Sequence, residues 1–226
     1  MPIMLCKLSA QLSSQDTPAL IDPIREALVM SLANRLGPRA NLFEETPEHA
    51  RQLHLERPIL TVSEFAKLRS LSAGPFKTAT VSTLFDVRGG PAAMEQALDA
   101  LCEAAAEAVR GGAGILILSD RGIDVTHAPI PALLANAAVH HHLIRQRLRT
   151  RTSLVVDTSE AREVNHFALL IGYGAEAIHP YLAFETLEAM RLRGDLGAVD
   201  EAKVLDNYIG SIGRGLLKIF SKMGIS

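Results

Sequence analysis

The sequence predicts an α/β protein whose core is a parallel β-sheet built from successive βαβ units, with mainly helical segments before and after it. The run "AGILILSD" (113–120) is continuously apolar, as are strands buried on both faces of a parallel sheet. The segment "PAAMEQALDALCEAAAEAVRGG" (91–112) begins with proline, is rich in alanine and leucine and ends in glycines, which predicts a long helix. After residue 76, strand-like and helix-like segments alternate with short loops between them, the pattern of right-handed βαβ units.

The first part of the chain, residues 1–75, is predicted to be a mainly helical lead-in. In "DPIREALVMSLANRLG" (22–37) the apolar residues keep helical spacing, from a possible aspartate N-cap to a terminating glycine. The pair Thr46–Pro47 is expected to open a short helix. "SEFAKLRSL" (63–71) is expected to form another helix after a serine cap.

The core, residues 76–198, contains the alternating units. The β-branched run "TATVSTLFDV" (78–87) predicts its first strand. After the long helix and the apolar strand we expect, in order, a helix (129–148), a strand (152–158), a helix (159–174), a strand (175–181) and a helix (183–194). The last segment, 199–226, is predicted to be mostly helix, and its tail "KMGIS" carries no stop signal.

Composition excludes several classes of function. The 226 residues are enough for one large domain or two small ones, and 48% of them are apolar. The formal net charge of −2, with no long run of one sign, argues against binding to nucleic acid or membrane surfaces through charge. The two cysteines, Cys6 and Cys102, lie far apart, so neither a disulfide framework nor a clustered zinc site is expected. With no secretory signal and no long apolar run, we expect a cytoplasmic protein.

Three adjacent histidines, His140, His141 and His142, raise the question of a metal site. On a helix, neighbouring side chains point about 100° apart, so the three cannot converge on one ion. A helical zinc pair needs histidines four positions apart, but Asn136 and Ile144 occupy those positions. We therefore expect one histidine to pack inward with a hydrogen bond, and the others to face solvent or a neighbouring domain.

Two further patterns are coincidental matches to known sites. Glu163 and His166 have the spacing of a di-iron site, but the second copy that such a site needs is missing, so a surface ion pair or a buried hydrogen bond is expected. "GYGAEA" (172–177) matches a dinucleotide-binding fingerprint, which needs a strand before it and a helix after it. Here a helix precedes and a strand follows, so Gly172 and Gly174 are interpreted as a helix end and a turn.

Two other places could carry chemistry. Asp120 and Arg121 follow a buried strand, where parallel α/β sheets place ligand sites; they could bind a ligand, pair with each other or cap the next helix. "GSIGRG" (210–215) has no strand before it, so its glycines are expected to allow close packing or to loosen the helix rather than to bind phosphate. Spacing alone assembles no Ser-His-Asp or Cys-His arrangement, and we assign no catalytic, cofactor-binding or metal-binding residue.

Several long stretches resemble the large chain of the glutamate synthase family: "ILILSDRG", "PIPALLANAAVHHHLIRQRLRTRTSLVVDTSEAREVNHFALLIGYGAEAIHPYLAFETL", "GLLKIFSKMGIS" and, earlier, "IDPIREALVMSLANRLGPRANLFEETPEHARQL". The likeness is to the central domain, between the glutamine amidotransferase domain and the FMN-binding synthase domain. It covers roughly residues 20 to 226 in order. Small departures include Asn165, where histidine is expected, and His179, where asparagine is expected.

The resemblance implies an enzyme that hydrolyses glutamine, channels the ammonia to 2-oxoglutarate and reduces the product with FMN, which receives electrons through a 3Fe-4S cluster. It also implies that these groups lie outside this chain. Cys6 is not in the family's nucleophile motif, and the FMN residues lie mainly beyond the last residue here. We therefore expect no cofactor in residues 1–226 and a non-catalytic interdomain scaffold that helps form the ammonia path. The electron donor stays open.

An excised middle piece should expose faces that meet the neighbouring domains. Self-association is therefore expected, with a poorly packed or exchanged tail (203–226). The layout of 153–178 is also similar to the late βα units of FMN-binding barrels, which suggests a partial or degenerate (β/α) barrel. Its loop "DTSEAR" (157–162) has no glycine, so we hypothesise a relic that has lost its phosphate site. The alternative is a free-standing barrel-like protein that binds phosphate or flavin.

Overall fold

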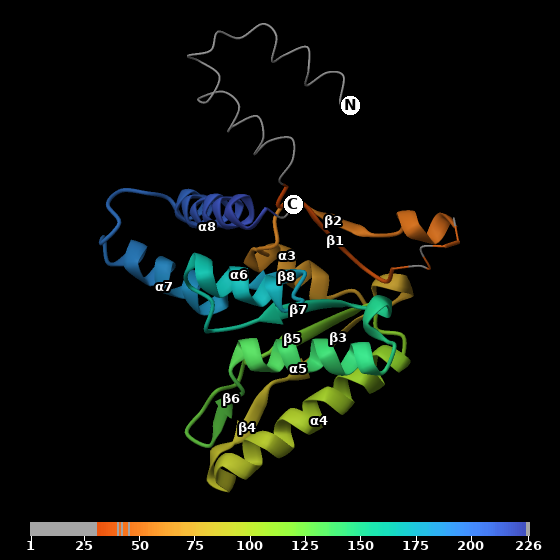
Figure 1. The fold of residues 1–226 in the computed structure, drawn as a ribbon. Helices are drawn as coiled ribbons and strands as arrows, with labels where there is room; N and C mark the ends of the chain where they lie inside the picture. Colours follow the sequence, from red (N-terminus) through yellow and green to blue (C-terminus); the bar gives the residue numbers. More distant parts are fainter. Residues whose placement is uncertain (1–30, 40, 42, 45, 225–226) are drawn as a thin grey trace, which may run out of the picture.

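The computed structural model describes residues 31–39, 41, 43–44 and 46–224 (Figure 1). Its core is a sheet of four parallel strands in the order β3-β5-β7-β8: β3 (Thr78–Ser82), β5 (Ile115–Ser119), β7 (Ser153–Asp157) and β8 (Ala177–His179). The order in space follows the order in the chain, so each crossover moves one strand in the same direction, as in a (β/α) barrel. The α/β fold with parallel βαβ units is therefore confirmed.

The free edge of β8 is covered by chain that precedes the whole sheet. Ile59 forms a parallel bridge with Ile178, Leu60 N donates to Ile178 O at 2.9 Å, and Ile178 N donates to Pro58 O at 2.8 Å. The segment entering the core thus lies beside its last strand. This neighbourhood is consistent with a partial barrel.

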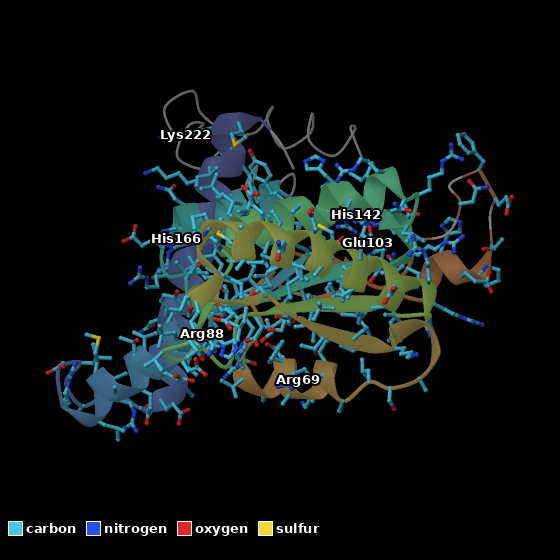
Figure 2. All side chains as sticks on the ribbon, turned by 90° about the horizontal axis from the view of Figure 1, so that it is seen from below. Arg69, Arg88, Glu103, His142, His166 and Lys222 are labelled. Atoms are coloured by element: carbon cyan, nitrogen blue, oxygen red, sulfur yellow. The ribbon has the colours of Figure 1, made fainter. Side chains whose placement is uncertain are left out.

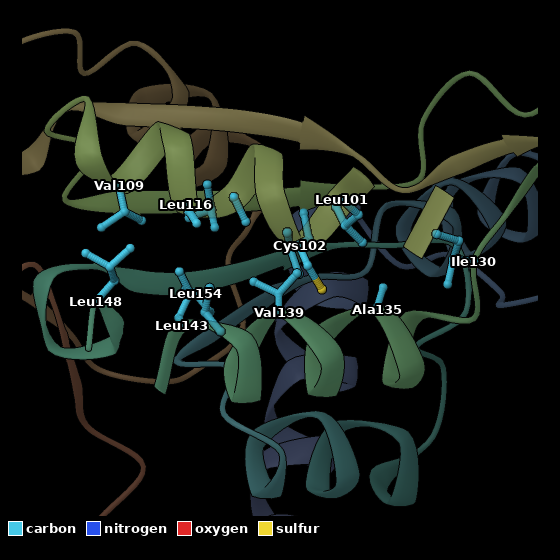
Figure 3. Close-up of a cluster of buried hydrophobic side chains, with 13 residues drawn as sticks. Leu101, Cys102, Val109, Leu116, Ile130, Ala135, Val139, Leu143, Leu148 and Leu154 are labelled. Atoms are coloured by element: carbon cyan, nitrogen blue, oxygen red, sulfur yellow. The ribbon is translucent and has the colours of Figure 1, made fainter. Parts of the chain in front are cut away.

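Helices cover both faces of the sheet. α4 (Gly90–Arg110), α5 (Ala132–Arg145) and α6 (Val164–Gly172) follow successive strands, whereas α3 (Val62–Arg69) precedes β3. Leu116, Leu118 and Leu154 pack with α4 and α5 on one face, in the cluster drawn in Figure 3. Ile115 and Ile117 point the other way, into a cluster that contains α3 residues. This alternation along β5 explains why its sequence is apolar at every position.

The last two helices, α7 (Tyr181–Leu192) and α8 (Glu201–Met223), complete the core around α6. Ile212 and Leu216 of α8 are buried in one cluster with Phe167 of α6. A methyl group at Gly215 would overlap the side chain of Val164, so this glycine lets α8 approach α6 closely. Close packing, one of the two roles expected for these glycines, is found. The expectation of a poorly packed tail is wrong up to Phe220, because the apolar stripe of α8 covers the core; residues 221–224 are exposed.

Two antiparallel ribbons were not predicted. β1 (Asn34–Leu36) pairs with β2 (Leu53–Leu55), and β4 (Leu84–Asp86) pairs with β6 (His127–Pro129). The expected helix 22–37 is wrong at residues 34–36, where Leu36 is fully buried by pairing and packing; residues 22–30 lie outside the described part. The expected strand 78–87 divides at Thr83, which hydrogen-bonds the carbonyl of Ser119 through both its N–H and its hydroxyl.

The remaining elements are short 3₁₀ turns: η1 (Pro47–Ala50), η2 (Gly74–Phe76), η3 (Val87–Gly89) and η4 (Arg149–Arg151). η1 is the short helix expected after Thr46, and α3 begins with a capping box between Thr61 and Glu64. Within the described residues, no helix is both long and apolar enough to cross a membrane.

Candidate functional site

Buried polar side chains gather where the parallel strands end. Those that follow or close β3, β5, β7 and β8 at this edge are Thr83, Ser119, Asp120, Asp157, Thr158 and His179, each less than 8% exposed. The carboxyl ends of parallel strands meet at one edge of a sheet, and α/β proteins place their ligands there. This carboxyl edge is therefore the candidate site.

Asp157 is buried, at 1% exposure. Its Oδ2 accepts hydrogen bonds from Ser119 Oγ at 2.7 Å and from Arg121 Nε at 3.0 Å. The guanidinium of Arg121 also lies over the Tyr181 ring, 3.9 Å from its centroid. Because a buried carboxylate is costly without a partner, the contact with Arg121 offsets the cost of burying Asp157. Pairing of Arg121 with Asp120, one of three alternatives left open by the sequence, does not occur.

Asp120 instead binds the loop after β7. Its Oδ2 accepts from Thr158 Oγ1 at 2.8 Å, from Ser159 N at 2.8 Å and from Ser159 Oγ at 3.0 Å. Burial and the neighbouring Asp120 carboxylate raise the pKa of Tyr181 to about 12. Asp120 does not cap the next helix either, since α5 begins after Pro131. The carboxylate joins the ends of β5 and β7.

His179 lies at the end of β8 and was not predicted to have a role. Its Nδ1 is 2.8 Å from the carbonyl oxygen of Leu60, which can only accept, so Nδ1 carries the proton. The ring stacks on Phe65 with centroids 4.3 Å apart. Burial lowers the pKa of His179, so the imidazole is neutral near pH 7 and presents Nε2 as an acceptor. The chain offered no spacing signal for this contact, because Leu60 lies far away in sequence.

A cavity of about 480 Å³ opens beside this edge, between it and the last two helices. Its apolar lining comes mostly from α7 and α8, and its polar lining consists of Arg121, His179, Tyr181, Glu185, Glu188 and Glu201. Such a lining offers hydrogen-bond acceptors and one cation. It does not assemble a nucleophile with a base beside it.

The histidines of the triplet diverge, as expected, but His142, expected to face solvent or a neighbouring domain, is also largely buried, with its side chain 12% exposed. His140 packs inward and accepts a hydrogen bond from Arg149 Nε at 3.0 Å; burial lowers its pKa. His141 is exposed. His142 of α5 lies beside Glu103 of α4, with Nε2 and Oε1 3.6 Å apart (Figure 2). Among the described residues, no three His, Cys, Asp or Glu side chains come together as a metal site.

Arg149 is a structural clamp that the sequence did not reveal. Its guanidinium donates to Gly174 O and to Glu176 Oε1, both at 2.8 Å, and to Thr152 O at 2.9 Å. Glu176 in turn accepts from the backbone N–H of Leu154 at 2.6 Å. This buried ion pair ties η4 to β7 and to the turn before β8.

The remaining sequence patterns have structural roles. His166 Nδ1 accepts from the backbone N–H groups of Arg162 and Glu163 at the start of α6, so His166 is hydrogen-bonded, but these bonds lie at an exposed position and are not buried as expected. α6 ends at Gly172 and a strand follows, which confirms that "GYGAEA" is not a dinucleotide fingerprint. Cys102 is buried in α4, and burial raises its pKa; Cys6 lies outside the described residues.

Comparison with known proteins places this fold in a family. The model of the glutamate synthase central domain matches residues 2–226. The chain belongs to the glutamate synthase central domain family. The resemblance noted in the sequence is thereby confirmed, and the carboxyl edge and its cavity are features of a central domain.

Relatives of this central domain are full glutamate synthases. The chain is 39% identical to glutamate synthase [NADH] of Saccharomyces cerevisiae and 44% identical to the ferredoxin-dependent chloroplastic enzyme of Spinacia oleracea, with the whole chain covered in both. It is 45% identical, over 94% of its length, to the glutamate synthase [NADPH] large chain of Azospirillum brasilense. The chain spans only 11 to 14% of the length of these three relatives, so it corresponds to one domain within a larger chain.

Proposed function

We propose that this central domain is a non-catalytic interdomain scaffold of a glutamate synthase. It links the glutamine amidotransferase and FMN synthase domains and helps form the ammonia path for making L-glutamate from glutamine and 2-oxoglutarate. One observation carries the proposal. The central-domain family model covers residues 2–226, yet this whole chain matches only a small part of the length of each relative. FMN and the 3Fe-4S cluster belong, in this proposal, to the rest of the parent chain. A cytoplasmic location is part of the same proposal, although the ferredoxin-dependent enzyme of Spinacia oleracea is chloroplastic by name and that of Arabidopsis thaliana is chloroplastic/mitochondrial.

The state of the ionisable groups at the carboxyl edge supports a structural role. Asp157 is paired with Arg121, Asp120 is bound by the loop after β7, and His179 donates its proton to Leu60. Each of these three side chains thus commits at least one acidic or basic atom to a hydrogen bond that holds strands and loops together, as a scaffold requires.

Exposed apolar side chains support contact with neighbouring domains. Phe43 is 96% exposed, Val125 is 95% exposed and Leu192, at the end of α7, is 71% exposed. Burying such side chains against another protein surface would be favourable. We assign these three side chains to contacts within the parent chain, and self-association to the domain in isolation.

An FMN titration of the purified 226-residue chain tests this proposal against the alternative of a free-standing phosphate- or flavin-binding protein. A scaffold leaves FMN fluorescence unchanged at flavin concentrations up to about 100 µM, well above the micromolar range in which a flavin protein saturates. Saturable quenching at micromolar FMN would overturn the scaffold. Arg121→Ala is the matched variant: quenching that it abolishes would place the flavin at the carboxyl edge.

The ammonia path is tested in a full-length enzyme. The central domain of the Azospirillum brasilense large chain would be replaced by residues 2–226 of this chain, and 2-oxoglutarate consumption would be compared with glutamine hydrolysis. We expect the natural ratio to be kept. A chimera that uses free ammonia normally but hydrolyses glutamine without consuming 2-oxoglutarate would contradict this part of the proposal.

A further inference from the structure

The loop after β7 points three hydrogen-bond donors at a single oxygen. Ser159 supplies its backbone N–H and its hydroxyl, and Thr158 supplies its hydroxyl; all three reach Asp120 Oδ2 within 3.0 Å. Donors that converge on one point at the carboxyl end of a parallel strand are the usual environment of a bound oxyanion. We call this set, Thr158 and Ser159 with their bound oxygen, the loop cradle.

Asp120 is held differently from its neighbour Asp157. Asp157 has Arg121 as an ionic partner, whereas no ion pair of Asp120 is found among the described residues. The second oxygen, Oδ1, is buried without a hydrogen-bond partner in the described part of the chain in both carboxylates, so it does not separate them. The difference lies at Oδ2: Asp157 Oδ2 meets the Arg121 guanidinium, whereas Asp120 Oδ2 is held by three hydrogen-bond donors of one loop. The environment of Asp120 Oδ2 is therefore that of an oxygen held by neutral donors.

We propose that the loop cradle is a binding site for a small oxyanion, a carboxylate or a phosphate, which the chain fills itself with the Asp120 carboxylate. Removing that carboxylate opens the site to an external oxyanion. The nearby negative charge of Asp157 does not prevent this, because Arg121 compensates it. The inference stands independently of the scaffold proposal, since it concerns what this loop binds and not what the domain connects.

The proposal also changes the interpretation of the loop "DTSEAR". The sequence suggests that a phosphate site was lost because the loop has no glycine. In the structure the loop does offer a backbone N–H and two hydroxyls, and the bound group is the chain's own side chain. The site is occupied from within the chain and is not missing.

Thermal unfolding of the full 226-residue chain tests the proposal. Wild type, Asp120→Ala and Asp120→Asn would be melted in sodium chloride, sodium formate and sodium phosphate at equal ionic strength, with formate matching the size of the removed group. We expect formate, phosphate or both to raise the melting temperature of Asp120→Ala above its value in chloride by about 3–6 °C, the shift expected near tenfold excess over Kd for a chain of this size. Wild type and Asp120→Asn, whose cradles remain filled, should show no such difference.

The double variant Asp120→Ala/Ser159→Ala is the control for the cradle, and its anion-dependent shift should be reduced or lost. A folded Asp120→Ala protein that melts at the same temperature in all three salts would overturn the proposal, as would an equal shift in wild type. If Asp120→Ala does not fold in chloride, recovery of cooperative melting in formate or phosphate supports the cradle. A variant that stays unfolded in all three salts overturns it, because an external oxyanion then cannot replace the carboxylate.

Discussion

Two glycines of α8 should respond in opposite ways to the same substitution. In a helix interior, replacing glycine by alanine normally stabilises by about 1 kcal/mol. At Gly210 the nearest atom to a new methyl group is the flexible end of Arg214, 3.5 Å away, so Gly210→Ala should gain this amount. At Gly215 the methyl group would overlap both γ-carbons of Val164 and lie 3.1 Å from its Cβ. Val164 is at the start of α6, where the backbone cannot yield freely, and overpacking of this kind costs about 1–3 kcal/mol.

Urea unfolding followed by far-ultraviolet circular dichroism measures the difference. We expect Gly215→Ala to be less stable than Gly210→Ala by about 1–3 kcal/mol, with unchanged dependence on urea. Adding Val164→Ala should cost less in the Gly215→Ala background than in wild type, because the methyl group fills the space that valine leaves. Equal stability of Gly215→Ala and Gly210→Ala would refute the close contact of α8 with α6.

Two further measurements test the clamp and the buried histidines. Arg149→Ala leaves the buried Glu176 carboxylate with only the more distant and exposed Arg39, 3.9 Å away, as an ionic partner and should lower the free energy of unfolding by about 3–5 kcal/mol in urea. The exposed control Arg88→Ala should leave it unchanged, and similar results for both variants would contradict the clamp. Because burial holds the folded-state pKa of His179 and of His140 below the unfolded value of about 6.5, the stability they contribute is present above that pH and is lost as the pH falls below it. The urea concentration at the unfolding midpoint should therefore decrease as the pH is lowered from about 7.5 to about 5.5. The decrease should be smaller in His179→Gln. If that variant keeps the pH profile of wild type, His179 does not bind its proton mainly in the unfolded state.

The sequence alone predicted most of the regular core, because its signals are local. The alanine-rich stretch becomes α4 and the apolar run becomes β5, each within a few residues of the expected ends. Helix propensity, and the continuous apolar run of a strand buried on both faces, depend on residues that are close together in the sequence. Both can therefore be recognised from the sequence alone. The same holds for the histidine triplet, whose divergence follows from helix geometry.

Only the tertiary structure decided the short strands and the polar contacts of the carboxyl edge. The segment 34–36 keeps helical spacing in sequence, yet pairing with β2 makes it a strand. Asp120 and Arg121 were recognised as candidates, but their partners, Ser159 and Asp157, lie on another strand or its following loop. Such contacts depend on which strands become neighbours in the sheet, and the sequence pattern alone does not specify those neighbours. The sequence therefore determined the family and the order of the βα units. The tertiary structure decided which side chains pair with one another at the carboxyl edge of the sheet.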